Sequence, residues 1–132
     1  MTRPLLPGLR GCRILVAEDE IIIAMEVQSA LEDAGAQVVG PACTLNEALR
    51  LAAEEDLTAA VLDLRLGSRS ADGVAVILTR RGIPFLFYSG QTSLDPELAK
   101  WPHIATVSKP ASSRALVKAL FTLLRTDSAL PP

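Results

Sequence analysis

The 132-residue sequence predicts one doubly wound α/β domain, in which a five-stranded parallel sheet carries helices on both faces. Two observations predict this fold class. Five short apolar runs alternate with five segments of helical periodicity, and no long linker interrupts the alternation. The strand-like runs are also apolar throughout, which is typical of parallel strands covered on both faces.

The first part of the chain supplies two strands and two helices. Arg13–Ala17 is the first predicted strand, and Gln37–Ala42 is the second. The helix between them has its apolar positions on one face, at Ile23, Val27, Ala30, Leu31 and Ala34. Gly35 ends this helix as a C-cap would. Thr44 opens the next helix, and Glu47 three residues later completes a capping box.

The alternation continues to the end of the chain. The remaining predicted elements are a strand at Ala59–Leu62, a helix that starts at Asp72-Gly73, a strand at Pro84–Tyr88, a short helix at Leu94–Lys100, a strand at Ile104–Val107 and a helix at Ser112–Arg125. A Gly- and Ser-rich loop follows Asp63. We expect residues 1–11 to form a flexible arm, 12–126 the domain, and 127–132 a tail.

The composition excludes several classes of function. Apolar residues make up 49% of the chain and charged residues 21%, as in a soluble globular protein. The net charge of -2, the absence of a basic tract and the few aromatic residues argue against a nucleic-acid partner. Cys12 and Cys43 fit no metal-ligand spacing. Without a signal-peptide pattern or an apolar run that could span a membrane, we expect a cytoplasmic protein without a membrane partner.

Polar side chains follow four of the predicted strands. Glu18 and Asp19 follow the first, Asp63 the third, Ser89 the fourth and Lys109 the fifth. Ligands of doubly wound sheets bind beyond these carboxyl ends. Three carboxylates brought together repel by about 4 kcal/mol per pair at intermediate dielectric, so a bound cation is expected, and oxygen ligands suit Mg²⁺. Carboxylates with Mg²⁺, a lysine and a hydroxyl make a site for a phosphoryl group.

Each of these residues also has an ordinary structural interpretation. Asp63 could cap a turn, and the acids after the first strand could favour a helix N-terminus through its dipole. Ser89 could belong to a turn and Lys109 to the surface, while Trp101 could be core or edge packing rather than a partner anchor. What favours a site is the coincidence of polar residues at four strand ends.

Four motifs, in this order and at these spacings, resemble those of response-regulator receiver domains of two-component systems. They are Val-Ala-Glu18-Asp19-Glu20, Val-Leu-Asp63, Tyr-Ser89-Gly90 and Val-Ser-Lys109-Pro110. The resemblance extends from about Arg13 to Arg125. It implies a flavodoxin-like fold with strand order 2-1-3-4-5.

The resemblance also implies roles for the residues at the strand ends. Asp63 would accept a phosphoryl group from the phosphohistidine of a sensor histidine kinase or a histidine phosphotransfer protein. Asp19 and Asp63 would bind Mg²⁺ directly, Glu18 largely through water, and the backbone carbonyl of Arg65 would complete the protein ligands. Lys109 would pair with Asp63 and then with the phosphoryl oxygens.

The remaining part of the resemblance concerns the switch. Ser89 would donate a hydrogen bond to the phosphoryl group and move with its loop. Thr106 stands where the family commonly has a switching aromatic residue. The stretch from Pro84 to Gly90 is similar to a subgroup with a Phe-x-Phe-Ala-Thr-Gly-Tyr type of motif, which partners with kinases of the HWE/HisKA2 kind, although Gln91 replaces its Tyr. We expect phosphorylation to shift the face built from Trp101, Thr106 and the last helix.

The first functional hypothesis is therefore a stand-alone receiver that is not a dedicated enzyme. It would signal through a phosphorylation-dependent contact with a downstream protein, or act as a phosphate sink or relay, as a monomer or weak dimer. The alternative is an interaction module on the same fold that is never phosphorylated. A hydrolase with Asp63 as nucleophile is disfavoured, because Arg65 stands where such enzymes place a second acid.

Overall fold

The computed structural model describes residues 8–90 and 95–129, with side chains described as far as residue 126. Four parts of the prediction lie outside the described residues. They are residues 1–7 of the arm, Gln91, the start of the helix expected at Leu94, and residues 130–132 of the tail. Within that part, no helix combines the length and apolarity needed to cross a membrane.

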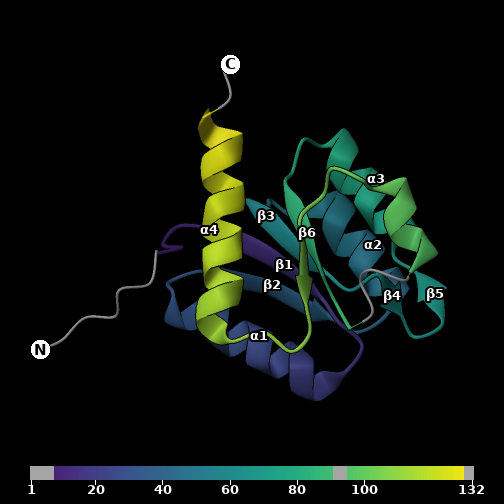
Figure 1. Ribbon diagram of the computed structural model, residues 1–132, viewed down its shortest axis with the longest axis horizontal. Helices are drawn as coiled ribbons and strands as arrows, with labels where there is room; N and C mark the ends of the chain where they lie inside the picture. The colour runs from purple at the N-terminus through teal and green to yellow at the C-terminus, as the bar shows by residue number, and fades with distance from the viewer. Residues whose placement is uncertain (1–7, 91–94, 130–132) are drawn as a thin grey trace, which may run out of the picture.

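A five-stranded parallel sheet forms the centre of the molecule (Figure 1). Its order is β2-β1-β3-β6-β7, which is the predicted 2-1-3-4-5 arrangement of the five strands. The strands are β1 (Arg13–Ala17), β2 (Gln37–Ala42), β3 (Ala59–Leu62), β6 (Phe85–Ser89) and β7 (Thr106–Ser108). The doubly wound fold predicted from the alternation is confirmed.

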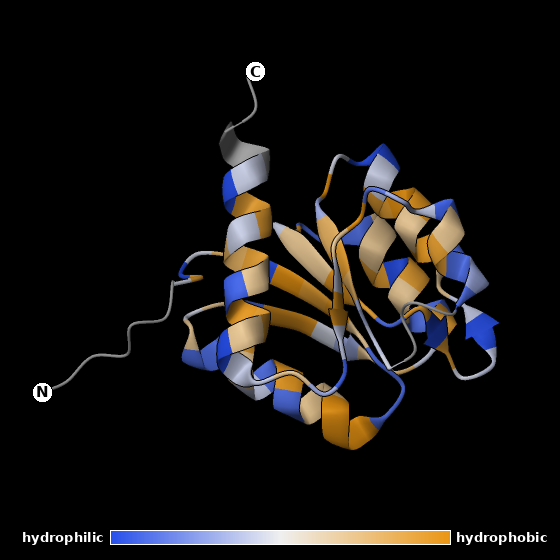
Figure 2. Ribbon diagram, viewed as in Figure 1, coloured by the Kyte–Doolittle hydropathy of each residue, from blue (hydrophilic) through white to orange (hydrophobic). Residues whose placement is uncertain are grey.

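In the described part of the chain, four α-helices cover the two faces of the sheet. They are α1 (Ile21–Asp33), α2 (Leu45–Glu54), α3 (Asp72–Arg80) and α4 (Ser113–Ala129). Helices α1 and α4 pack together on one face, and α2 and α3 on the other, as Figure 1 shows. Apolar residues line the strands between these layers (Figure 2).

The core is divided by the sheet because successive strand residues point to opposite faces. Ile14 and Val16 of β1 pack toward α1 and α4, whereas Leu15 packs toward α2 and α3. In the same way Leu86 and Phe87 of β6 belong to opposite core layers. Strands whose side chains enter both core layers have no face toward water, which explains why they are apolar throughout.

The register of the sheet aligns the strand ends. Ala17, the last residue of β1, lies opposite Leu62, the last residue of β3. Leu62 in turn pairs with Phe87, and Ser89 at the end of β6 pairs with Ser108 of β7. The residues that follow these strands therefore emerge at one edge of the sheet.

The segment after Asp63 is more ordered than the loop predicted for it. It contains an antiparallel hairpin of β4 (Arg65–Leu66) and β5 (Arg69–Ser70). Gly67 adopts a φ of 66° in its turn, a conformation that glycine tolerates well, and Leu66 is buried. The buried leucine fastens the hairpin to the core.

Three other elements differ from the prediction for local reasons. The short helix is a 3₁₀ helix, η1 (Pro96–Lys100), capped by the side chain of Asp95 and too short for a stable α-helix. Strand β7 starts at Thr106 and not at Ile104, and as the sheet edge it is partly exposed. Helix α4 continues to Ala129, into the expected tail, because no glycine or proline stops it before Pro131.

The described residues of the expected N-terminal arm pack against the domain. Leu9 is buried among residues of α1 and α4, and its backbone N–H donates to the Ala34 carbonyl at 2.8 Å. Among the described arm residues, Leu9 is thus held against the domain, whereas Gly8, Arg10 and Gly11 are exposed. Ala34 is the C-cap of α1, one residue before the predicted Gly35, and Gly35 follows it in the left-handed conformation with a φ of 98°.

Candidate functional site

Three acids meet where β1 and β3 end. The backbone N–H of Asp63 donates to the Ala17 carbonyl at 3.0 Å, so Asp63 emerges beside Glu18. One carboxylate oxygen from each of Glu18, Asp19 and Asp63 lies within 4.8 Å of the others. The alignment of two neighbouring parallel strands is thus what gathers the acids.

Lys109 reaches the same point from the end of β7. Its Nζ lies 2.6 Å from Glu18 Oε1 and 2.7 Å from Asp63 Oδ2, with Glu20 Oε2 at 4.0 Å. The backbone N–H of Lys109 donates to the Ser89 carbonyl at 2.9 Å, which fixes where its side chain starts. The side chains of Lys109, Glu18 and Asp63 are 10%, 3% and 13% exposed, so the ion pairs are largely shielded from water. One lysine therefore neutralises acids from two strands.

Burial and pairing pull the ionisation of this cluster in opposite directions. Burial raises the pKa of Glu18 to about 7, against the hydrogen bonds that Lys109 and the Glu20 N–H donate to it. Burial lowers the pKa of Lys109, but hydrogen bonds to Asp63 and Glu18 outweigh burial and raise that pKa above its ordinary value. The lysine stays charged, and Glu18 exchanges its proton near neutral pH.

Backbone N–H groups orient all three acids. The Glu20 N–H donates to Glu18 Oε2 at 3.1 Å, and the Gly67 N–H donates to Asp19 Oδ2 at 2.8 Å. The Arg65 N–H lies 3.5 Å from Asp63 Oδ1. Two of these donors belong to the β4–β5 hairpin, so the hairpin and the acids form one structural unit.

The donor set fits a small hard cation. All three side chains offer carboxylate oxygens, within 4.8 Å of one another, and Asp19 is exposed, which leaves room for water ligands. Mg²⁺ takes oxygen ligands and keeps several of its waters. The predicted metal ligands Glu18, Asp19 and Asp63 are thus brought together, and Arg65, whose carbonyl was predicted as a fourth ligand, begins the adjoining hairpin.

The other predicted residues lie in two places. Ser89 is buried at the end of β6 and is joined through its carbonyl to Lys109. Trp101 packs its ring edge-to-face on Phe85, with centroids 6.0 Å apart, and its Nε1 donates to Asp72 Oδ1 at 2.9 Å. Thr106 is exposed on β7. Among the described residues, neither Trp101 nor Thr106 makes a side-chain hydrogen bond or ion pair with the acids.

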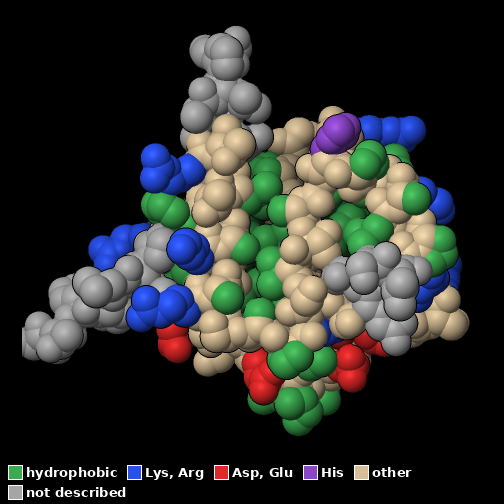
Figure 3. Space-filling view, viewed as in Figure 1, with side chains coloured by type: hydrophobic (Ala, Val, Ile, Leu, Met, Phe, Trp, Pro, Cys, Tyr) green, Lys and Arg blue, Asp and Glu red, His purple; other side chains and the backbone are tan. Residues whose placement is uncertain are grey.

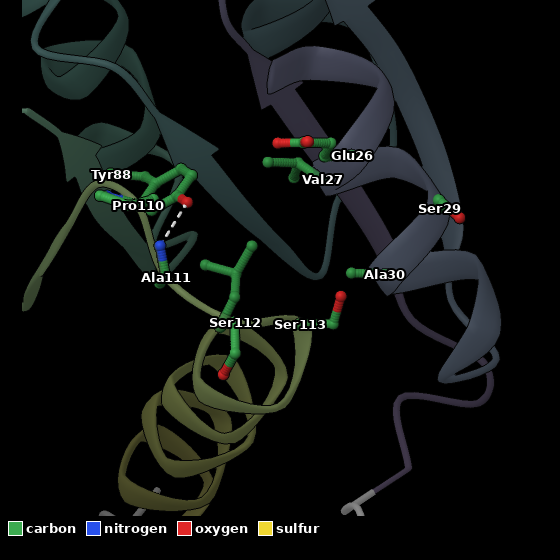
Figure 4. Close-up of a pocket in the computed structure, with 10 residues that line it drawn as sticks. Glu26, Val27, Ser29, Ala30, Tyr88, Pro110, Ala111, Ser112 and Ser113 are labelled. Carbon is green, nitrogen blue, oxygen red and sulfur yellow. Dashed lines mark hydrogen bonds between the residues drawn. The ribbon is translucent and has the colours of Figure 1, made fainter. Parts of the chain in front are cut away.

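Tyr88 is a site neighbour that the sequence analysis did not single out. Lys109 Nζ lies 5.7 Å from the centre of its ring, and its hydroxyl accepts a hydrogen bond from the Ala111 N–H at 3.0 Å. Figure 4 shows this bond at the edge of a pocket of about 470 Å³ between α1 and the start of α4. The position of Tyr88 directly before Ser89 in the fourth predicted strand was the sequence feature that could have indicated a place near the site.

A second set of contacts was also missed. Arg65 Nη2 lies 2.8 Å from Asp95 Oδ1, across thirty residues of sequence. Ser70 Oγ donates to Glu97 Oε2 at 2.7 Å. Only the Asp95-Pro96 pair, a typical start for a short helix, hinted at the position of η1.

Comparison with known proteins finds relatives among response regulators. No family model matches the chain. The Phyllosphere-induced regulator PhyR of Methylorubrum extorquens is 34% identical over 117 residues, which cover 82% of this chain and 43% of PhyR. The chain thus spans less than half the length of this curated relative.

Two solved structures carry the comparison further. The response regulator PhyR from Brucella abortus is 28% identical with a TM-score of 0.76, and the match covers 93% of this chain and 51% of that chain. A response regulator receiver protein from Sinorhizobium medicae WSM419 is 26% identical with a TM-score of 0.78, over 91% of this chain and 99% of that chain. In its sheet order the chain has the fold of response-regulator receiver domains, and in sequence it is similar to these relatives.

Proposed function

We propose that this receiver domain accepts a phosphoryl group on Asp63 from the phosphohistidine of a sensor histidine kinase or a histidine phosphotransfer protein. The observation that carries the proposal is the contact of 2.7 Å between Lys109 Nζ and Asp63 Oδ2 beside Glu18 and Asp19. A nucleophilic carboxylate that is held by an ammonium group, next to two further acids, suits phosphoryl transfer better than a purely structural role.

The transfer step needs few groups. A carboxylate oxygen of Asp63 attacks the phosphorus atom, a P–O bond forms, and the P–N bond to the donor imidazole breaks. The imidazole leaves with the bonding electrons and takes up a proton. Lys109 stabilises the charge on the phosphoryl oxygens, and Ser89 donates a hydrogen bond to one of them. Later attack of water on the phosphorus atom returns Asp63 and releases phosphate.

A divalent cation completes this chemistry. Glu18, Asp19, Asp63 and the Arg65 carbonyl would hold Mg²⁺, which when bound neutralises negative charge on the phosphoryl oxygens. Without a metal, the negative phosphoryl group would approach two further acids with only Lys109 to offset them.

The phosphodonor has an apolar surface to dock on. Ile21, Ile22 and Met25 of α1 are 59%, 67% and 58% exposed, directly after the acids of the site. Figure 3 shows hydrophobic side chains flanked by acidic ones where α1 begins. We assign this patch to the partner that carries the histidine, because a helix docked there would bring its side chains to Asp63. Such a partner would meet the chain in the cytoplasm.

The output is a contact with a downstream protein, or passage of the phosphoryl group along a relay. Phosphorylation adds charge and acceptor oxygens at Asp63, which shifts the population between two conformations of the domain. A monomer or weak dimer without a dedicated enzymatic activity suits this role. The alternative is an interaction module that is never phosphorylated. Such a module would not require a lysine paired with Asp63 at the end of the sheet.

Intact-mass measurement separates these possibilities. With Mg²⁺ and a small-molecule phosphodonor, we expect wild type to gain the mass of one phosphoryl group and Asp63→Asn to gain none. Asp56→Asn, a change at an exposed acid, is the matched control and should behave as wild type. Equal labelling of Asp63→Asn, or no labelling of wild type, would overturn the proposal.

A further inference from the structure

Three side-chain contacts tie the hairpin segment (Arg65–Asp72) to the tethered segment (Asp95–Trp101). They are Arg65–Asp95 at 2.8 Å, Ser70–Glu97 at 2.7 Å and Trp101–Asp72 at 2.9 Å. In Figure 1 the η1 turn, in light green, lies beside β5 and α3. The segment that follows the phosphoacceptor therefore holds the segment that follows β6.

Arg65 is the member of this set that adjoins the site. It follows Asp63 by two residues, and its backbone N–H lies 3.5 Å from Asp63 Oδ1. Leu64 between them is buried, whereas Asp63 and Arg65 are both partly exposed, so both face away from the core. The side chain of Arg65 therefore starts two residues from the carboxylate that would be phosphorylated, on the same side of the backbone, and ends at Asp95.

Among the described residues, the guanidinium group of Arg65 pairs with the carboxylate of Asp95. Asp95 accepts a hydrogen bond from the Glu97 N–H at 2.9 Å and another from Arg65. The Glu97 N–H, and then Arg65, lower the pKa of Asp95. A phosphoryl group would offer more negative charge and three acceptor oxygens, a geometry that guanidinium groups bind in a bidentate manner. Lys109 already contacts both Glu18 and Asp63, so Arg65 would add a second cation to the phosphoryl group beside Lys109.

We propose that Arg65 couples the site to the tethered segment, by exchanging Asp95 for the phosphoryl oxygens once Asp63 is phosphorylated. The exchange removes the one ion pair that joins the hairpin segment to Asp95 and loosens Asp95–Trp101. This inference rests on the proposed function. Arg65 acts here as a positioning residue, and the receiver needs no aromatic residue at Thr106 for its signal to reach this surface.

The tethered segment is suited to such a change. A 3₁₀ helix of five residues has poorer hydrogen-bond geometry than an α-helix, and none of its residues is fully buried. Trp101 closes the segment and packs on Phe85. Since Trp101 is the sole tryptophan of the sequence, its fluorescence reports on this segment alone.

The test measures tryptophan emission and intact mass in the same samples, before and after treatment with a small-molecule phosphodonor and Mg²⁺. In wild type we expect a red shift of emission that rises in proportion to the phosphorylated fraction. Asp95→Asn should show most of that shift before treatment, and little more after it. Arg65→Gln should do the same. Arg69→Gln, which removes an exposed arginine from the same hairpin, should match wild type.

The readouts separate the two proposals. Wild type that gains the phosphoryl mass with no change in emission would overturn the coupling and leave the proposed function standing. Asp95→Asn with the resting emission and the full response of wild type would also overturn it. If wild type gains no mass, the proposed function fails, and the coupling fails with it.

Discussion

Replacing Glu18 with glutamine should abolish a loss of stability that the metal-free domain undergoes as the pH rises. The pKa of Glu18 is about 7 in the folded chain against an ordinary value of 4.5. Between these values the folded chain holds a proton that the unfolded chain has released, so the free energy of unfolding falls as the pH rises. The stabilisation that comes from the proton on Glu18 is fully present below pH 4.5 and is lost as the pH rises through about 7.

The magnitude follows from the same two values. Each pH unit between them contributes about 1.4 kcal/mol, and rounding at both ends leaves about 2 kcal/mol between pH 5 and pH 7.5. Glutamine keeps the shape and the oxygen that contacts Lys109 but does not titrate. We therefore expect Glu18→Gln to lose about 2 kcal/mol less than wild type over this interval.

Urea denaturation of both proteins at the two pH values, with chelator present, measures this difference. Glu26→Gln, at an exposed position of α1, is the control and should retain the wild-type pH dependence. Added Mg²⁺ should stabilise wild type at pH 7.5 more than Glu18→Gln, because a cation favours the ionised carboxylate. If Glu18→Gln loses stability with pH as steeply as wild type does, another group carries the effect and our description of the cluster is wrong.

Three further predictions concern the rest of the domain. Lys109→Met removes the cation that pairs two shielded acids and should lower the free energy of unfolding by about 3 kcal/mol in chelator, whereas the exposed control Lys118→Met should change it little; equal losses would contradict the pairing. Leu62→Ala opens a cavity at a position with no exposed surface and should cost about 3 kcal/mol by denaturant titration, and a loss below about 1 kcal/mol would show that the core there is not packed as described. The double change Ile21→Ser and Ile22→Ser should leave stability within about 0.5 kcal/mol of wild type while slowing phosphotransfer from a histidine-phosphorylated donor and not from a small phosphodonor; unchanged transfer from the protein donor would refute the docking patch.

The sequence predicted the central strands well because their environment is simple. Arg13–Ala17 and Ala59–Leu62 are the central strands observed, since a run buried on both faces has a distinct apolar composition. The edge strand β2 was also predicted with its observed bounds, Gln37–Ala42. The other edge strand, β7, was placed two residues too early, because its three residues are exposed or partly exposed and do not stand out by composition. The start of α2 was also predicted, and Thr44 Oγ1 accepts from the Glu47 N–H at 3.2 Å, although Glu47 bonds the Cys43 N–H and not that of Thr44.

The gathering of the acids was predictable for a topological reason. Once β1, β3, β6 and β7 lie side by side as parallel strands in this order, the residues after them must emerge at one edge, whatever their side chains. The contact between Arg65 and Asp95 had no such basis. It depends on a hairpin and a 3₁₀ turn whose positions are set by tertiary packing, and on two side chains thirty residues apart.

Peptide mapping after transfer from a phosphorylated histidine kinase tests the central claim most directly. We expect the phosphoryl group on the peptide that contains Asp63, with transfer dependent on Mg²⁺ and strongly reduced by Lys109→Met. A phosphoryl group located on any other residue, or transfer that proceeds equally well in chelator, would contradict the account.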